Sequence, residues 1–309
     1  MILHNENRLT FLVEVHTTPP LDFSKGEESW RGGDVVMHKF AYKLAERGQR
    51  VVTFSEPMFP HENISFITST YSDDGEMWFL SERLQFPLNE TISVYPEIQP
   101  GQPLATKFNA RWFLSDDLNH PWIESENDAY FNFSTWKTDR PTQHLKAIHY
   151  NFENLYKTNN GRRKGFCHVL HKYTPKDFES ILKPFNSENI SGWRERGGIS
   201  YLREKLNEYE YLITFDKHTA MTYLPGLCGC KSILYNADEH IEWKNMTPEE
   251  YRLKHPHRKY GCAFGIEDIE WANKTIDLVP DHLKEMEKED DKSIDNFIKF
   301  WEKKIGFKV

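Results

Sequence analysis

The sequence has no hydrophobic run long enough to cross a membrane. Every apolar segment is shorter than the roughly 18 residues that a transmembrane helix needs. The chain begins MILHNE, which lacks the basic and then apolar pattern of a secretory signal peptide. We therefore expect a cytoplasmic protein with no membrane-spanning segment.

Cysteine is scarce, with four residues in a chain of 309. Cys228 and Cys230 are close in sequence, but no second pair has the spacing of zinc ligands. The sequence therefore argues against a structural zinc site. We expect reduced, half-buried thiols, as is usual in cytosolic proteins.

An excess of positive charge is also missing. Lysine and arginine number 39 against 47 aspartates and glutamates, which gives a formal net charge of −8. Long-range attraction to nucleic acid or to an anionic membrane is therefore not expected, although a local basic patch stays compatible with this balance. No G-x-G-x-x-G pattern follows either opening strand, which argues against a NAD-type oxidoreductase.

The length predicts two domains, at roughly 100–200 residues for each. A hydrophobic content of 38% is enough for sizeable cores. The clearest linker runs from Asn159 to Gly165, with the sequence NNGRRKG. We place an N-terminal domain at 1–160, a C-terminal domain at 161–291 and a C-terminal helix at 292–309.

The N-terminal half has the pattern of a doubly wound α/β domain. An apolar strand at 9–15 is followed by Gly32-Gly33, then by apolar residues at helical spacing from Val35 to a stop at Gly48, then by a strand at 51–54. Strand, glycine loop, helix and strand in this order are typical of Rossmann-like units. Further along, we predict strands at 92–95 and 129–133 and a helix at about 105–114.

The C-terminal half repeats the alternation of strands and helices. Strands are predicted at 166–170, 211–215 and 232–235, and helices at 200–209, 222–230 and 266–278. A turn is predicted at 261–265 and a charged, solvated connector at 285–292. Apolar residues at 294, 297, 298, 301 and 305 then predict an amphipathic C-terminal helix.

The stretch from Tyr209 to Asn236 organises this half. It reads as a buried strand, a polar turn at 216–220, a helix and a second strand. The N-terminus of a helix at the carboxyl edge of a parallel sheet presents backbone N–H groups that bind phosphate. The pattern therefore predicts a phosphate-bearing ligand at 216–220.

Several segments, in consistent order, are similar to a bacterial and viral branch of the GT-B glycosyltransferases. The matching residues are Gly32-Gly33, Val94-Tyr95-Pro96-Glu97-Ile98 with Gly101, Pro103-Leu104 and Arg111-Trp112, Lys164-Gly165 with Lys172, Asp216 with Thr219-Ala220 and Cys228-Gly229-Cys230, and Tyr260-Gly261 with Ala263-Phe264-Gly265. The branch usually carries Asn where this chain has Gln102. If the source is viral, the protein is expected in the host cytoplasm.

The resemblance implies a GT-B fold, in which two Rossmann-like domains face a cleft and the C-terminal helix packs back on the N-terminal domain. It implies transfer of a sugar from a nucleotide-sugar, such as a UDP- or GDP-sugar, to an acceptor hydroxyl on a glycan or small molecule. No metal or other cofactor is implied. Backbone amides and side-chain cations would neutralise the diphosphate instead.

The candidate site residues follow from these matches. For the donor phosphates we expect Gly32, Gly33, Lys172, His218, Thr219 and Ala220. Asp216 stands where many retaining relatives carry the first Glu of a Glu-x7-Glu pair, but Leu224 occupies the second position. A simple helix N-cap is an equal reading of Asp216.

Two residues are candidates for a catalytic base, and two for contacts to the acceptor. His16 follows the first strand and Asp34 follows the Gly-Gly loop, and either could take a proton from an acceptor hydroxyl. Glu97 and Arg111 are candidate acceptor or cleft residues. For His16 and Asp34 the sequence favours the simpler reading of a polar residue in the cleft wall, and Glu97 could instead contact a loop amide.

Two alternatives stay open from the sequence. One is a related enzyme that glycosylates hydroxylated bases in DNA, which the net negative charge disfavours. The other is an inactive relative that binds a nucleotide or a glycan, which the missing carboxylate at Leu224 favours.

Overall fold

The computed structural model describes residues 8–15, 32–54, 57, 59–66, 70–71, 77–78, 90–97, 99, 106–114, 125–133, 141–148, 155–171, 173–216, 219–235 and 245–306. The chain divides into two compact units. The described residues up to Ile148, together with those from Glu287 onward, belong to the first unit, and those from Leu155 to Met286 belong to the second.

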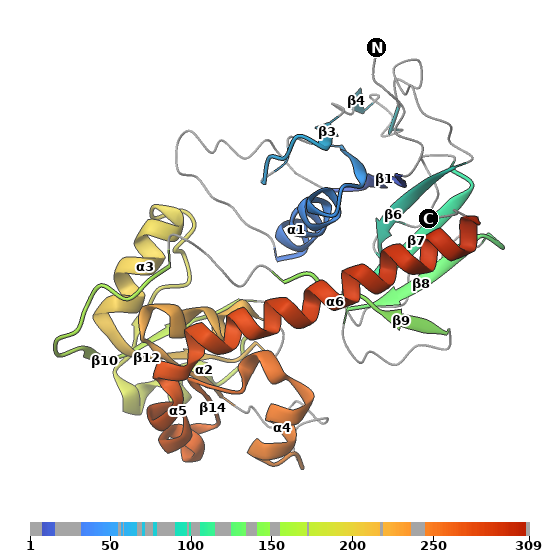
Figure 1. Ribbon diagram of the computed structural model, residues 1–309. Helices are drawn as coiled ribbons and strands as arrows, with labels where there is room; N and C mark the ends of the chain where they lie inside the picture. The colour runs from blue at the N-terminus through green and yellow to red at the C-terminus, as the bar shows by residue number, and fades with distance from the viewer. Residues whose placement is uncertain are drawn as a thin grey trace. The chain divides into compact units, whose positions relative to one another are not determined.

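The first unit is built on a seven-stranded sheet in the order β3-β2-β1-β6-β7-β8-β9. All of its strand pairs are parallel. Its strands are β1 (Thr10–Val13), β2 (Arg50–Thr53), β3 (Ile64–Phe66), β6 (Thr91–Pro96), β7 (Phe108–Phe113), β8 (Asp128–Asn132) and β9 (Thr142–His144) (Figure 1). A separate antiparallel pair is formed by β4 (Thr70–Tyr71) and β5 (Met77–Trp78).

Helices α1 (Gly32–Glu46) and α6 (Val279–Ile305) supply the helical part of the first unit's core. Phe297 of α6 packs against Phe11, Phe40 and Phe131, with ring centroids 5.6, 5.2 and 4.7 Å away. Trp301 is fully buried in the same core. The prediction that the C-terminal helix packs on the N-terminal domain is therefore confirmed.

Residues 285–292, which the sequence analysis predicts as a connector, are helical. Helix α6 therefore begins earlier than predicted. Two of their acidic side chains have basic partners on α1. Glu287 lies 3.1 Å from Lys39 and 3.4 Å from Lys43, and Asp291 lies 3.1 Å from Lys43. The run of charge that suggested a solvated connector is thus part of a packed helix, in which Glu287 and Asp291 lie on the face toward α1.

The predicted helix at 105–114 is wrong, because this segment contains strand β7 in the middle of the sheet. Every residue of β7 is buried, and the strand pairs with β6 on one side and β8 on the other. The strand is short and rich in aromatic residues (FNARWF), as expected for a strand that is covered on both faces.

The second unit has a five-stranded sheet in the order β11-β10-β12-β13-β14, with all pairs parallel. Its strands are β10 (Lys164–Val169), β11 (Glu188–Asn189), β12 (Tyr209–Thr214), β13 (Lys231–Leu234) and β14 (Cys262–Phe264). Its α-helices are α2 (Phe178–Leu182), α3 (Gly198–Glu208), α4 (Pro248–Lys254) and α5 (Ile269–Thr275) (Figure 1). Short 3₁₀ helices are η3 (Lys183–Phe185), η6 (Pro256–Arg258), η7 (Ile266–Asp268) and η8 (Ile276–Leu278).

Two predictions for this unit need correction. The turn predicted at 261–265 contains the edge strand β14. The helix predicted at 222–230 is replaced by two short 3₁₀ helices, η4 (Ala220–Thr222) and η5 (Leu224–Cys228). Pro225 lies at the start of η5, and its missing N–H interrupts the hydrogen-bond ladder that a continuous helix would need.

The two units thus form an α/β protein with two Rossmann-like parallel sheets. All four cysteines are fully buried and none forms a disulfide, so they are more deeply buried than predicted. Among the described helices, none is both long and apolar enough to cross a membrane.

Candidate functional site

The order of strands in the second unit reverses between β10 and β12. The chain moves from β10 to β11 on one side, and from β12 to β13 and β14 on the other. In open parallel sheets, ligands bind outside the carboxyl ends of the strands at such a switch point, because the loops there diverge. The residues after β10 and β12 therefore form the first candidate site.

A histidine and an aspartate meet at this switch point. His171 follows β10, Asp216 follows β12, and the imidazole Nδ1 lies 3.6 Å from the Asp216 carboxylate Oδ2. The Asp216 side chain is buried, whereas the His171 side chain is 41% exposed. A buried carboxylate beside one ring nitrogen orients the imidazole, so that the other nitrogen can face a ligand.

Thr219 and Ala220 form the turn after Asp216. The Thr219 hydroxyl accepts a hydrogen bond from the Met221 N–H at 3.2 Å, and so caps η4. The Tyr223 N–H donates to the Ala220 carbonyl at 3.1 Å. A hydroxyl that accepts one bond still has its own proton to donate. Thr219 can therefore contact a phosphate oxygen through its side chain.

The replacement of the predicted helix at 222–230 by η4 and η5 weakens the contribution of a helix dipole to phosphate binding. A single turn of 3₁₀ helix has a much smaller dipole than the several α-helical turns that the sequence suggested. Binding at 216–220 therefore depends on side chains and local amides. Lys172 and His218, both predicted phosphate ligands, lie outside the described residues.

A further polar residue fixes the end of β10. The Ser191 hydroxyl accepts the Leu170 N–H at 2.8 Å, and the Ser191 N–H donates to the Asn189 side chain at 2.8 Å. This contact holds the backbone immediately before His171. Sequence reasoning missed both His171 and Ser191, because their roles depend on which strands are neighbours.

The first unit has its own switch point, between β1 and β6. Three polar side chains form a row across neighbouring strands there. The Glu14 N–H donates to the Val94 carbonyl at 3.0 Å, and the next residue, Tyr95, is in register with Arg111 of β7. The Arg111 guanidinium lies 4.8 Å from the Tyr95 ring centroid.

The row lies on the face of the sheet opposite to the apolar core. Val13, Val94 and Ala110 belong to the core that α1 and α6 cover. Since side chains alternate between faces along a strand, Glu14, Tyr95 and Arg111 point the other way. Apolar and polar residues thus divide between the two faces at this edge.

Glu14 is the least ordinary member of the row. Its side chain is 3% exposed, and burial raises the pKa of its carboxyl to about 8, while the charge of Arg111 acts in the opposite direction. Such a carboxyl holds its proton at neutral pH. The sequence signal for it is a single charged residue inside the mostly apolar strand 9–15.

The predicted acceptor residues Glu97 and Arg111 are both buried and bind backbone groups. The Glu97 carboxylate accepts the Leu114 N–H at 2.8 Å. Arg111 donates to the Gln99 carbonyl at 3.0 Å, and its Nε lies 3.8 Å from the Asp128 carboxylate. These contacts hold the chain around the ends of β6 and β7, and a contact with an acceptor stays a prediction.

The remaining predicted residues are His16, Gly32, Gly33 and Asp34. His16 falls outside the described residues, and the side chain of Asp34 is not described. Gly32 and Gly33 are the first residues of α1 and do not form a loop before it. A Cβ built on Gly33 meets no atom of the described residues within 4 Å, so none of these residues packs closely enough to require a glycine there.

No model of a known protein family matches the sequence, and no curated protein shows significant similarity to it. Within the described residues, no group of three or more His, Cys, Asp or Glu side chains is placed to hold a metal ion.

Proposed function

We propose that the protein is a GT-B-type glycosyltransferase. It would transfer a sugar from a nucleotide-sugar to a hydroxyl of a glycan or other small carbohydrate. Two Rossmann-like parallel sheets in one chain, and a C-terminal helix packed on the N-terminal unit, support this proposal. The ordered set of motif residues from Gly32 to Gly265 supports it as well.

The observation that carries the proposal is the His171–Asp216 pair at the switch point of the second unit. The motif that suggested donor binding, Asp216 with Thr219-Ala220, follows β12 at the edge where ligands of parallel sheets bind. The half-exposed imidazole beside this motif adds a group that can donate to a phosphate oxygen.

Each residue of this site has a distinct task in the proposal. Thr219 and the backbone at 218–220 bind the diphosphate, and Lys172 supplies a positive charge. Asp216 orients His171, whose ring contacts the donor. Stabilising the negative charge that develops on the leaving diphosphate lowers the barrier to transfer, and requires no metal ion.

A ligand screen tests the proposal. The purified protein is heated with UDP-, GDP-, ADP-, CMP- or dTDP-sugars, and release of the nucleoside diphosphate is measured in parallel. One donor should raise the melting temperature, since ligand at 100 times its Kd stabilises a protein by about 2.7 kcal/mol. That donor should also be hydrolysed slowly. Binding without turnover for every donor would contradict the transferase and favour an inactive binding protein.

Substitutions then locate the donor. Thr219→Ala should weaken donor binding about tenfold or more, because one hydrogen bond to a charged group contributes roughly 1.5–3 kcal/mol. Asp216→Asn should weaken it as well, because the carboxylate that orients His171 is lost. Asp281→Asn is the matched control, since Asp281 lies in the first turn of α6 and its side chain is 88% exposed. Equal affinities in all three variants would place the donor elsewhere.

A further inference from the structure

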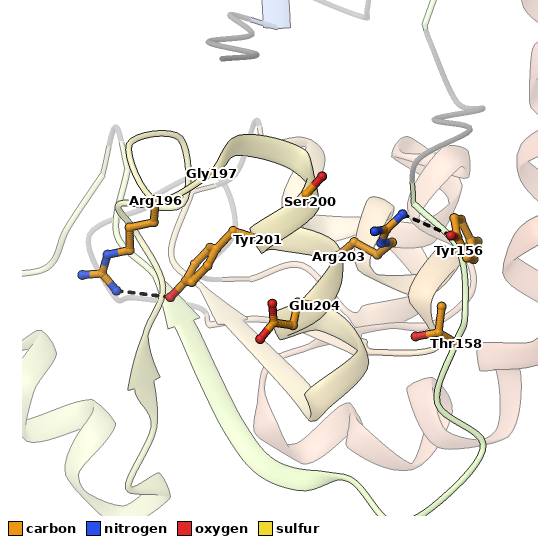
Figure 2. Close-up of a pocket in the computed structure, with 8 residues that line it drawn as sticks. All are labelled: Tyr156, Thr158, Arg196, Gly197, Ser200, Tyr201, Arg203 and Glu204. Carbon is orange, nitrogen blue, oxygen red and sulfur yellow. Dashed lines mark hydrogen bonds between the residues drawn. The ribbon is translucent and has the colours of Figure 1, made fainter. Parts of the chain in front are cut away.

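The second unit carries a polar cavity that the proposed donor site does not include. It has a volume of about 480 Å³, within the range of roughly 300–1,000 Å³ that small-molecule sites occupy. Its walls come from α3, the turn before α3 and the extended segment 155–160. The lining residues are Tyr156, Thr158, Arg196, Gly197, Ser200, Tyr201, Arg203 and Glu204 (Figure 2).

One wall of this cavity is fixed by a single asparagine. The Asn207 side-chain oxygen accepts the N–H groups of Thr158 and Asn159, at 2.6 and 3.1 Å. Its side-chain nitrogen donates to the Tyr156 carbonyl at 3.0 Å. The segment that carries Tyr156 and Thr158 is therefore held along α3, so this wall is already in place without a ligand.

Two arginines line the cavity, and each is oriented by a tyrosine. Arg203 donates to the Tyr156 hydroxyl at 3.1 Å and lies 5.0 Å from the centroid of that ring. Arg196 donates to the Tyr201 hydroxyl at 3.2 Å. Figure 2 shows Tyr201 and Glu204 between Arg196 on one side and the Arg203–Tyr156 pair on the other.

The charge of these arginines is available to a ligand. Within the part of the chain that the structure describes, neither guanidinium pairs with a carboxylate. A guanidinium has five N–H donors in a planar fork, and each tyrosine uses only one of them. Glu204 is the single acidic residue of the lining, so positive charge is in excess.

We propose that this cavity binds a small hydroxylated organic anion, whose phosphate or carboxylate group is held by Arg203, while Arg196 adds positive charge on the other side of the cavity. The planar donor fork of arginine matches both of these acidic groups. Ser200 and Thr158 can donate to the ligand or accept from it, and the Glu204 carboxylate accepts hydroxyl protons. The tyrosine rings offer flat apolar surface to the body of the ligand.

Calorimetric titration of the full chain tests this site. The probes are glucose 6-phosphate, glucuronate, glucose and inorganic phosphate, so that the phosphate and carboxylate sources are separated and each part of the ligand is tested alone. We expect one of the two hydroxylated anions to bind at least tenfold more tightly than glucose and than inorganic phosphate. Binding of neither anion, or equal binding of all four probes, overturns the proposal.

Variants then tie the binding to the cavity. The double variant Arg196→Gln/Arg203→Gln should lose at least tenfold in affinity for the anion, and Arg203→Lys should lose part of it because the planar fork is gone. Arg162→Gln removes an exposed arginine outside the cavity and should bind as the parent does. Circular dichroism confirms that each variant is folded. Unchanged affinity in the folded double variant or in folded Arg203→Lys overturns the assignment.

Discussion

The imidazole Nδ1 of His171 lies 3.6 Å from the carboxylate Oδ2 of Asp216. The two residues follow neighbouring parallel strands, β10 and β12, at the point where the strand order of the second sheet reverses. This contact brings His171, which the sequence analysis did not identify as a site residue, next to Asp216 of the predicted donor motif. The donor site we propose depends on it.

Removal of the imidazole should weaken donor binding. We expect His171→Ala to lower the affinity for the nucleotide-sugar about tenfold or more, because a hydrogen bond to a charged group is lost. Calorimetric titration measures this directly. His282→Ala is the control, since His282 is a partly exposed histidine that contacts the Pro256 carbonyl in the same unit. An equal loss in both variants would contradict a direct contact at His171.

The buried carboxyl of Glu14 should make stability depend on pH. Its pKa is raised from the usual 4.5 to about 8, so the folded chain holds a proton that the unfolded chain releases. The stabilisation is therefore complete below about pH 4.5 and is lost as the pH rises through about 8. Each unit of pKa difference corresponds to about 1.4 kcal/mol.

The variant Glu14→Gln isolates this effect, because glutamine stays neutral at every pH. Urea unfolding of both proteins should give similar free energies near pH 4.5, and the variant should become the more stable one by pH 8.5. Subtracting the free energies of unfolding of the two proteins removes most of the contribution of the other titrating groups. A constant difference across this range would show that Glu14 is already ionised in the folded chain.

Val279, the first residue of α6, packs closely against Gly226 and Gly261 of the second unit. A Cβ added to Gly226 would lie 2.6 Å from Cγ1 of Val279, and one added to Gly261 would lie 2.6 Å from Cγ2. We expect Gly226→Ala to lower the free energy of unfolding by about 1–3 kcal/mol through overpacking. Urea denaturation measures this loss.

A second substitution checks the cause. Val279→Ala removes the methyl groups that the new Cβ would meet, so the double variant should lose less stability than the two single variants together. Gly165→Ala is the control, because a Cβ there meets no atom of the described part of the chain within 4 Å. Strict additivity of the two losses would rule out a clash between Gly226 and Val279.

The C-terminal helix should be essential to the core of the first unit. Trp301 is fully buried among aromatic residues that include Phe108 and Phe300. We expect Trp301→Ala to lower the free energy of unfolding by about 3–5 kcal/mol. Lys303→Ala, an exposed change in the same turn, should have little effect on thermal unfolding. Equal melting temperatures in these two variants would contradict the packing of α6.

The sequence predicts strands well where a short apolar run ends at a polar residue. β1, β2, β6, β8, β10, β12 and β13 all lie within about two residues of their predicted positions. Prediction failed where one sequence pattern fits two kinds of secondary structure. The segment that contains Arg111 and Trp112 can be read as a helix or as a doubly covered strand, and only its neighbours β6 and β8 decide between them.

The site is less predictable than the fold. Asp216 and Thr219 follow a predicted strand, so the sequence places them at a sheet edge. It does not say that β10 is the neighbour of β12, and therefore the contact with His171 could not be foreseen. The same holds for the cavity beside α3, because one of its walls depends on how Asn207 holds the segment before β10.

Hydrogen–deuterium exchange with and without the nucleotide-sugar found in the screen tests the central claim most directly. We predict slower exchange in the peptides that cover 170–173 and 214–222, where the donor should order the ends of β10 and β12. Peptides from the other end of this sheet, at 161–165 and 229–232, should be unchanged. Protection confined to the first unit, or protection that spares 214–222, would contradict a donor site at the switch point of the second sheet.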